Sequence, residues 1–347
     1  MPVCGRRISP LFLSAFAVVA AGLAQTARAH PPAPFIQGID PLEAGLIGTA
    51  PSAEAAQFGA LRDQSEAVTD AIFDRIRDLS RALALGLPRS ASAPDSSRLA
   101  AAADPSDPGA WIDASGSYLA DTAAVGYHGS NVIALTGLDT VIDKRWVAGF
   151  SAGYTHDDLI FKSVASERTA NGAVFGPYAA YIIAPHLSLN GLFNYTRLSN
   201  SILSVFPGPN GSFGSNRLIG AGELDFYADK GPFKLTGFGG YSYSWEGADN
   251  NLLSATPPFS NTLRYGVLKL GGEAGYQTGA TELYLPLKFE YETTSPRDGT
   301  GRAALVVGAG VRYRWSAALK LGLVATTTQL KSHYEDVLIA GNLRVSF

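Results

Sequence analysis

The chain has 347 residues, of which 46% are hydrophobic and only 16% are charged, whereas about 25% of the residues in an average soluble domain are charged. Its net charge of −3 gives no reason to expect a nucleic-acid partner. No run of about 18 apolar residues follows the amino-terminal region, so the sequence predicts no membrane-spanning helix in the exported chain.

The first segment, residues 1–29, is predicted to be a secretory signal peptide. Arg6 and Arg7 give it a positive start, an apolar core follows, and Ala27-Arg28-Ala29 has the small-x-small pattern of a cleavage site. The lone cysteine, Cys4, lies within this segment, so the exported chain is expected to have no disulfide and no thiol chemistry. The segment has three arginines and no acid, so its removal changes the net charge from −3 to −6.

Residues 52–86 are predicted to form one amphipathic helix, because apolar residues recur at helical spacing with charged residues between them. Ser52 is a candidate N-cap, and Gly86 is a stop signal. Residues 30–51, which are rich in Pro, Gly and Ala, are predicted to be disordered, and residues 87–108 are predicted to be a linker. The apolar stripe of the helix consists of Phe58, Leu61, Val68, Ile72, Ile76, Leu79 and Leu83.

Residues 109–347 are predicted to be all-β, because apolar and polar residues alternate along twelve strand-like segments. In the ninth segment, Leu283 and Leu285 share one face and Glu290 lies on the other. The core of a soluble sandwich would not tolerate such charges, whereas a water-filled lumen does. The predicted fold is therefore a twelve-stranded antiparallel transmembrane β-barrel with one N-terminal amphipathic helix. The segments lie near 110–119, 129–140, 144–156, 168–183, 185–199, 213–228, 232–246, 261–278, 280–293, 301–315, 316–330 and 334–347.

The connections between these segments alternate between short and mostly longer ones. Tight turns are predicted around Asp143, Pro185, Lys230, Gly279 and Ser316. Outer-membrane barrels have short periplasmic turns and longer outer loops, so both ends of the barrel are expected in the periplasm. Aromatic side chains favour membrane interfaces. They form one belt of Trp146, Phe233, Trp315 and Phe347 at the periplasmic end, and another of Tyr154, Tyr195, Tyr243, Trp245 and Tyr291 at the outer end.

Five short patterns in the barrel region carry a resemblance to a known family. They are Trp111 at the start of the first strand, Leu135-Thr-Gly-Leu-Asp139, Trp146-Val-Ala-Gly-Phe-Ser-Ala-Gly-Tyr154, Phe175-Gly-Pro-Tyr-Ala-Ala-Tyr181 and the terminal Phe347. In these patterns, residues 111–347 resemble the translocator domain of autotransporters, the barrel of type V secretion. The resemblance implies insertion by the barrel-assembly machinery, which recognises the last strand ending in Phe347, together with passage through periplasmic chaperones. It also implies a helix in the pore and export of an amino-terminal passenger.

The chain departs from the family in two ways. The residues between the expected signal and the barrel lack the long β-solenoid of most passengers, so the passenger is expected to be absent or vestigial. In addition, residues 87–108 separate the helix from the first strand, whereas the pore helix of the family leads in closely. Two placements therefore stay open for residues 52–86, a plug in the pore or an interaction helix in the periplasm, and the apolar stripe is unusual for a charged lumen.

The charges of the helix favour the plug. Its arginines suit lumen acids and its aspartates suit lumen arginines. The helix charges in question are Arg62, Arg75, Arg77, Arg81, Asp63, Asp70, Asp74 and Asp78. The expected lumen charges are Glu223, Asp225, Glu282, Lys288, Glu290, Arg312 and Arg314.

Patterns for catalysis and metal binding are weak. His128 and Ser130 allow a phospholipase-like alternative, but the sequence implies no acid or amide partner for them. His156-Asp157-Asp158 allow a metal site or an omptin-like protease pair, but a solvated acidic turn at a loop base explains them better. The helix segment has no Asn, so self-cleavage beside paired Asn is not expected. No residue is therefore assigned a catalytic, cofactor-binding or metal-binding role, no cofactor is expected, and the chain is expected not to be an enzyme.

The sequence thus predicts a monomeric barrel in the outer membrane of a Gram-negative cell, in contact with lipid. Its expected role is structural, in secretion or surface display with a vestigial passenger. The alternatives are an outer-membrane enzyme, phospholipase- or omptin-like, and a small pore or adhesin that differs only in the helix and loops.

Overall fold

The computed structural model describes residues 49–85, 109–121, 127–161, 166–204, 211–249, 262–294, 301–316, 319–331 and 334–345, all within the compact unit Gly48–Phe347. The predicted signal peptide, the predicted linker and most of the segment expected to be disordered lie outside these residues, as do His30, His333 and Phe347. What the sequence predicts for these residues stays a prediction.

The helix α3 runs from Thr49 to Ala84 and is 36 residues long, which is about 54 Å at 1.5 Å per residue. Ser52 lies inside the helix, so the prediction that it is the N-cap is wrong, and residues 49–51 are helical rather than disordered. Alanine is frequent in this segment and favours the helix. Among the described residues, no helix has the length and apolar character that a bilayer span requires.

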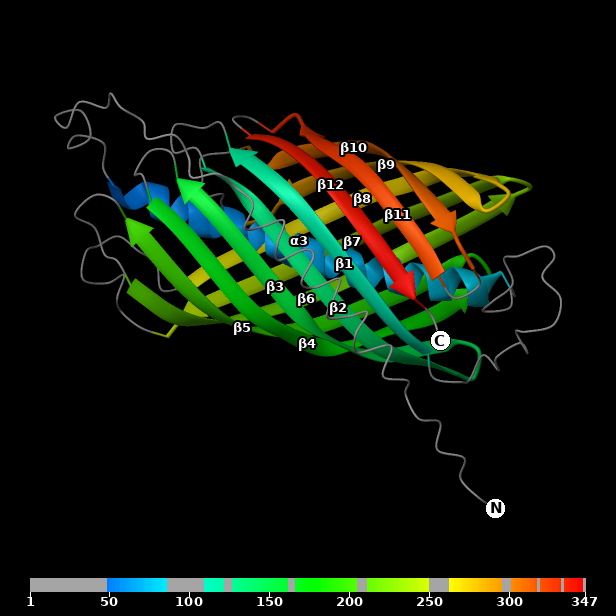
Figure 1. The fold of residues 1–347 in the computed structure, drawn as a ribbon. Helices are drawn as coiled ribbons and strands as arrows, with labels where there is room; N and C mark the ends of the chain where they lie inside the picture. The colour runs from blue at the N-terminus through cyan, green and yellow to red at the C-terminus, as the bar shows by residue number, and fades with distance from the viewer. Residues whose placement is uncertain are drawn as a thin grey trace, which may run out of the picture. The chain divides into compact units, whose positions relative to one another are not determined.

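The twelve strands form one closed antiparallel barrel in which each strand pairs with its neighbours in sequence, and β1 pairs with β12 (Figure 1). The predicted fold class is therefore confirmed. The strands are β1 (Gly109–Asp121), β2 (Tyr127–Ile142), β3 (Trp146–Phe161), β4 (Ser166–Ala184), β5 (Leu187–Ser204), β6 (Gly211–Lys230), β7 (Phe233–Ala248), β8 (Thr262–Thr278), β9 (Thr281–Glu292), β10 (Ala303–Arg314), β11 (Leu319–Gln329) and β12 (Tyr334–Val345).

Side chains alternate between the outside and the lumen along each strand, as a period of two requires. In β9, Leu283 and Leu285 are more than half exposed on the outside, whereas Glu290 and Glu292 are buried on the inside. In β12, Val337 and Ile339 are exposed, and Leu338 faces the lumen. Trp146, Phe233 and Trp315 of the predicted periplasmic belt are exposed, as are Tyr154, Tyr243 and Tyr291 of the outer belt. Tyr195 and Trp245 are half-buried on the same face.

Tight turns close one end of the barrel and longer connections lie at the other, as predicted. The tight turns use backbone conformations with positive φ at Asp143, Lys144, His186, Gly231 and Gly279. Two of these positions are glycines, which adopt such angles at little cost. The connections at the opposite end include the intervals 205–210, 249–261 and 293–302. We call the two ends the tight-turn end and the long-loop end.

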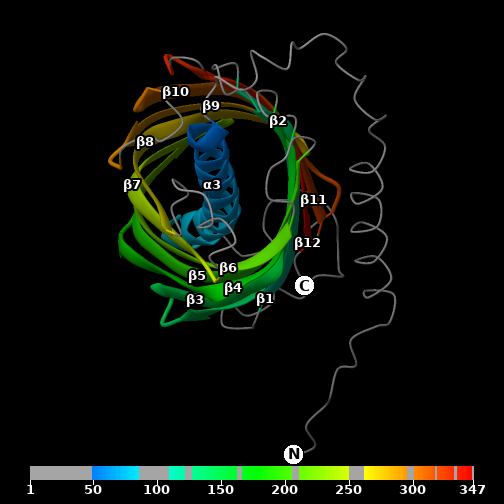
Figure 2. The same ribbon diagram turned by 90° about the vertical axis from the view of Figure 1, so that its left-hand side faces the viewer.

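The helix lies inside the barrel (Figure 2). Its apolar side packs against inward side chains of β1 to β6, and these residues form the largest apolar cluster of the described chain. The helix side of the cluster contains Val68, Ile72, Phe73, Ile76 and Leu79. The barrel side contains Trp111, Ile133, Leu135, Val141, Val147, Val174, Tyr178, Ala180, Leu192 and Ile219.

Candidate functional site: a helix held in the pore

The helix spans the lumen from one end to the other. Near its start, Arg62 donates to the hydroxyl of Tyr127 at 3.1 Å and lies 3.7 Å from a carboxylate oxygen of Glu292. Tyr127 begins β2 and Glu292 ends β9, so both lie at the long-loop end. Near the end of the helix, Asp78 pairs with Lys320 at 3.1 Å, and Lys320 lies beside the tight turn before β11. Of the two placements that the sequence left open, the structure has the one in the pore.

The apolar stripe of the helix fits the lumen because part of the inner wall is apolar. Ile72 and Ile76 are fully buried against the wall. At the long-loop end, Phe58 meets Tyr265 of β8 edge to face, with ring centroids 5.8 Å apart. The stripe looked unusual for a charged lumen, and the apolar part of the wall accounts for it. The signal lay in Ile133 and other inward positions of the early strands, where alternation already put apolar residues on the lumen side.

The middle of the helix is anchored by a buried hydrogen-bond network. Arg75 donates to both carboxylate oxygens of Asp139, at 2.9 and 3.1 Å. The hydroxyl of Tyr178 donates to the same carboxylate at 3.1 Å and accepts a hydrogen bond from the indole of Trp111 at 2.7 Å. All four side chains are buried. Bidentate pairs between arginine and carboxylate are strong and fix geometry, so strands β1, β2 and β4 jointly position this arginine.

Glycines make room for the two rings of this network. A Cβ at Gly137 would clash with the indole of Trp111, and one at Gly149 would clash with the ring of Tyr178. Each glycine lies directly across the strand pair from its ring, as Trp111 pairs with Gly137 and Tyr178 with Gly149. Four of the five sequence patterns that carry the family resemblance therefore contribute to one cluster, and that cluster holds the helix.

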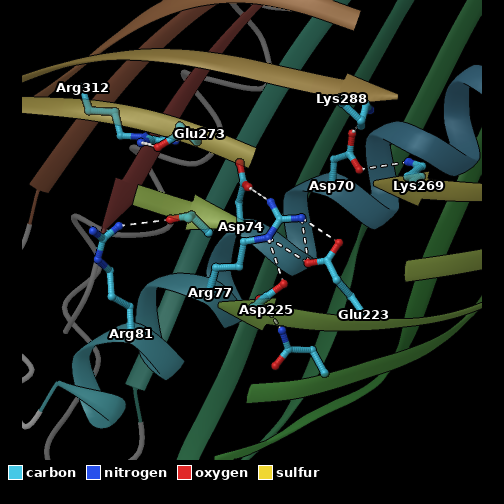
Figure 3. Close-up of polar contacts among 12 residues, drawn as sticks. Asp70, Asp74, Arg77, Arg81, Glu223, Asp225, Lys269, Glu273, Lys288 and Arg312 are labelled. Atoms are coloured by element: carbon cyan, nitrogen blue, oxygen red, sulfur yellow. Dashed lines mark hydrogen bonds and ion pairs between the residues drawn. The ribbon is translucent and has the colours of Figure 1, made fainter. Parts of the chain in front are cut away.

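The next arginine of the helix, Arg77, pairs with carboxylates of β6 (Figure 3). It donates to both oxygens of Glu223 at 2.8 Å and lies 3.8 Å from Asp225. Its guanidinium also lies 4.4 Å above the ring centroid of Phe238. Arg81 pairs with Asp229 near the tight-turn end. The predicted pairing of helix arginines with Glu223 and Asp225 is confirmed.

Across to the wall, Asp70 and Asp78 of the helix pair with lysines rather than with arginines, whereas Asp63 and Asp74 pair with arginines of the helix itself. Asp70 lies 3.2 Å from the ammonium groups of both Lys269 and Lys288 (Figure 3). The predicted partner Arg312 instead donates to Glu273 at 2.6 Å and to Glu282 at 3.1 Å. The cause is the position of Arg312 on β10. Its guanidinium lies within hydrogen-bonding distance of Glu282 on the adjacent strand β9 and of Glu273 on β8.

A polar belt crosses the inner wall near the long-loop end and was not predicted. Arg217 donates to Glu246 at 2.6 Å and also to Gln64 of the helix. Farther round, Arg168 pairs with Asp157 at 3.3 Å and donates to Asn200 at 2.7 Å. Alternation put these residues on the lumen side, but nothing in the sequence indicated which of them would meet.

The helix leaves part of the lumen open. A cavity of about 430 Å³ lies along its acidic face. It is bordered by helix residues from Arg62 to Ala82 and by residues of β1, β2 and β6 to β12. The helix packs mainly on β2 to β8, so the cavity extends over the side of β9 to β12 that the helix leaves uncovered.

The structure separates the residues of the proposed metal or protease site. Strand β3 extends to Phe161, so residues 156–158 lie within a strand and not at a loop base, as the sequence had suggested. Asp157 faces the lumen and pairs with Arg168. His156 lies on the outward face, with its Nδ1 2.8 Å from the amide oxygen of Asn171. Within the part of the chain that the structure describes, no three His, Cys, Asp or Glu side chains are grouped as a metal site requires.

His128 and Ser130 share the outward face of β2. Ser130 is the cross-strand partner of Asp158, so the structure brings an acid to this pair that the sequence had not implied. His186 lies in a tight turn at the opposite end of the barrel, with φ of 77°.

The closed barrel with an inward helix defines an outer-membrane translocator barrel. The chain belongs to the autotransporter family, because the model of the Autotransporter beta-domain matches residues 110–329. This membership indicates a location in the outer membrane of a Gram-negative cell. No curated protein sequence matches the chain.

Solved structures show the same fold at low sequence identity. The beta domain of the Bordetella autotransporter BrkA has a TM-score of 0.56 and 17% identity, over 70% of this chain and 100% of that one. The translocator domain of NalP from Neisseria meningitidis has a TM-score of 0.56 and 13% identity, over 82% and 98%. The transport unit of AIDA-I from Escherichia coli has a TM-score of 0.50 and 13% identity, over 77% and 97%.

Proposed function

We propose that this translocator barrel keeps its helix in the pore and displays the short segment before the helix at the cell surface. The observation that carries the proposal is the direction of the helix. Its first half is bound at the long-loop end through Arg62, and its last turns are bound at the tight-turn end through Asp78 and Arg81. If the longer loops face outward, as in other outer-membrane barrels, the start of the helix at Thr49 lies toward the outer mouth.

The same contacts support a plug role for the helix. It is tied to the wall by buried pairs at its centre and by more exposed pairs along its acidic face. The lumen would be wet if empty, because Glu223, Lys288 and Arg312 face it. We therefore propose that the helix narrows the pore to the cavity beside it and lowers ion flow.

The partners we propose are the lipid of the outer membrane, periplasmic chaperones during transit and the barrel-assembly machinery. The last of these would recognise β12, whose Val337 and Ile339 face outward. We further propose that the chain acts as a monomer, binds no nucleic acid and performs no catalysis. Replacing His128 and His156 by alanine while assaying lipid and peptide hydrolysis tests the last point, and a loss of either activity would restore the enzyme alternative.

Cysteine labelling on whole cells tests the display. Once the predicted signal is removed the chain has no cysteine, so single substitutions are clean probes. Ser212→Cys and Ser254→Cys in the long-loop region and Gly38→Cys before the helix should react with an impermeant thiol reagent. Gly279→Cys, in a tight turn, is the control and should react only after the outer membrane is opened. Labelling of Gly279→Cys alone would reverse the orientation and refute the display.

Deletion of Phe347 tests the assembly proposal. Without a completed last strand, the barrel would expose unpaired backbone groups at an open edge. The amount of protein in the outer membrane should fall, and aggregate should accumulate in the periplasm. Unchanged membrane levels would count against recognition of this terminus.

A further inference from the structure

The outward face of β3 to β6 is polar near the long-loop end, whereas most of the outward face is apolar. The polar residues are Tyr154, Asn171, Arg197, Ser199, Ser212 and Asn216, which we call the outer patch. Five of them line a groove of about 510 Å³ on the outside of the barrel, and Asn216 holds Arg197 beside it. The groove belongs neither to the lumen nor to the helix anchors.

Arg197 is the charged group of the groove and is held in place from one side. It donates to the amide oxygen of Asn216 at 2.9 Å and pairs with Asp249, just past the end of β7. Asn216 in turn donates to Asp249 at 2.7 Å and accepts from the hydroxyl of Tyr195 at 2.5 Å. The hydrogen bond from Arg197 lowers the pKa of the Asp249 carboxyl.

Arg197 retains donors for a further acceptor. A guanidinium has five N–H groups, and among the described residues only Asn216 and Asp249 take hydrogen bonds from it. Its side chain is half exposed. Gly214 lies beside it, and a Cβ there would come within 2.6 Å of both the guanidinium and the carboxylate of Asp249. The groove therefore stays open next to a fixed cation.

The level of the groove along the barrel axis indicates which part of the membrane it contacts. Tyr154 lines the groove and Tyr195 precedes Arg197 by two positions on the same face, and both belong to the outer aromatic belt. Such belts lie at the level of the lipid headgroups. Arginine recognises phosphate through paired N–H groups. The NH2 group of Asn171 and the hydroxyls of Ser199 and Ser212 are groups that pair with sugar hydroxyls, and these neutral groups beside Arg197 favour a phosphorylated sugar over a bare anion.

We propose that the outer patch binds the phosphorylated sugar headgroup of outer-leaflet lipopolysaccharide. This inference rests on the proposed outward placement of the long loops. The binding proposal and the display proposal can be refuted independently. The binding experiment uses purified protein and does not depend on orientation in a cell. The labelling experiment above does not depend on lipid binding.

Native mass spectrometry of the full chain in detergent tests the proposal. The probes are lipid A with two phosphates, the same lipid with both phosphates removed, and phosphatidylglycerol. Wild-type protein should retain phosphorylated lipid A in preference to the other two. Arg197→Ala should weaken this binding about tenfold, which corresponds to about 1.4 kcal/mol, because the substitution removes the charged donor for the phosphate.

Arg264→Ala is the matched control. Arg264 is exposed on β8, across the strand pair from Trp245 of the outer belt, and lies outside the groove. Its loss should leave lipid A binding unchanged, and both variants should keep the mobility difference between heated and unheated samples on a detergent gel. Equal weakening by the two substitutions, or none by either, overturns the proposal. So does equal retention of the three lipids, or displacement of lipid A by millimolar inorganic phosphate, since a free anion would then satisfy the groove.

Discussion

The lumen has two unlike halves. On the side of β2 to β6, the helix packs through Ile72 and Ile76 against apolar residues and is fixed by the buried pair of Arg75 and Asp139. On the side of β9 to β12, a cavity separates much of the helix from the wall, and the contacts are ion pairs such as that of Asp78 with Lys320. One half resembles the core of a soluble protein, and the other resembles a solvated surface.

This difference explains how the helix can have a fixed position although a cavity runs beside it. Apolar burial and a desolvated bidentate pair fix its position, because both depend on close fit. Charged pairs in a wet space contribute little to stability and tolerate water between them. The four predictions below test this division, from the largest expected effect to the smallest.

Deletion of residues 52–85 removes the apolar packing and the ion pairs of the helix together, so it should have the largest effect. The single-channel conductance in planar bilayers should rise several-fold over that of the full chain, because the whole charged lumen becomes available to ions. The barrel itself should remain resistant to detergent without heating. Equal conductance of the two proteins, together with cleavage at Arg75 by a protease added from the periplasmic side, would put the helix outside the pore.

Arg75→Ala should destabilise the docked helix by about 3–5 kcal/mol, since it leaves the buried carboxylate of Asp139 without its charge partner. The protein is heated in detergent and run on a gel. The temperature at which the band of the folded barrel gives way to the band of the unfolded chain should fall. Asp139→Asn keeps the shape and one acceptor oxygen but leaves the buried guanidinium of Arg75 without its charge partner, so it should also lower this temperature. If Arg75→Ala changes neither this temperature nor the conductance, the network does not hold the helix.

Ile72→Ala tests the apolar contact alone. It should lower stability by about 2–5 kcal/mol, as for other buried isoleucines that are cut back to alanine. Open-channel noise should increase because the helix packs less closely on β2 to β5. Ala82→Ser, at a position facing the cavity, is the control and should be nearly silent. An effect of Ile72→Ala no greater than that of the control would remove the claimed difference between the two halves.

Lys320→Ala should have the smallest effect. Its pair with Asp78 leaves both side chains 40% exposed, so the expected cost is about 0–1 kcal/mol. Conductance should change slightly, because the substitution alters the charge on the open path. A loss of stability as large as that of Arg75→Ala would mean that the cavity side also fixes the helix.

The barrel could be predicted from the sequence because its signals are local. Alternation along segments such as 281–292 separates the lipid side from the lumen side, and turn residues such as Gly279 mark where each strand ends. With sequential neighbours pairing around the ring, strand number and order follow from one repeated pattern. The amphipathic helix was equally local, apart from its first residue, where no capping geometry is visible in the sequence alone.

The tertiary structure decided which lumen residues meet. Period-two alternation places Asp139, Glu223 and Lys288 inside, but it does not give their height along the pore or their angle around it. Those follow from the register of all twelve strands, and so does the meeting of Trp111, Tyr178 and Asp139 around Arg75. The sequence therefore determined the barrel and the alternation of lumen-facing and outward side chains along its strands. The long-range pairing of the closed sheet decided that the helix has one packed side and one wet side.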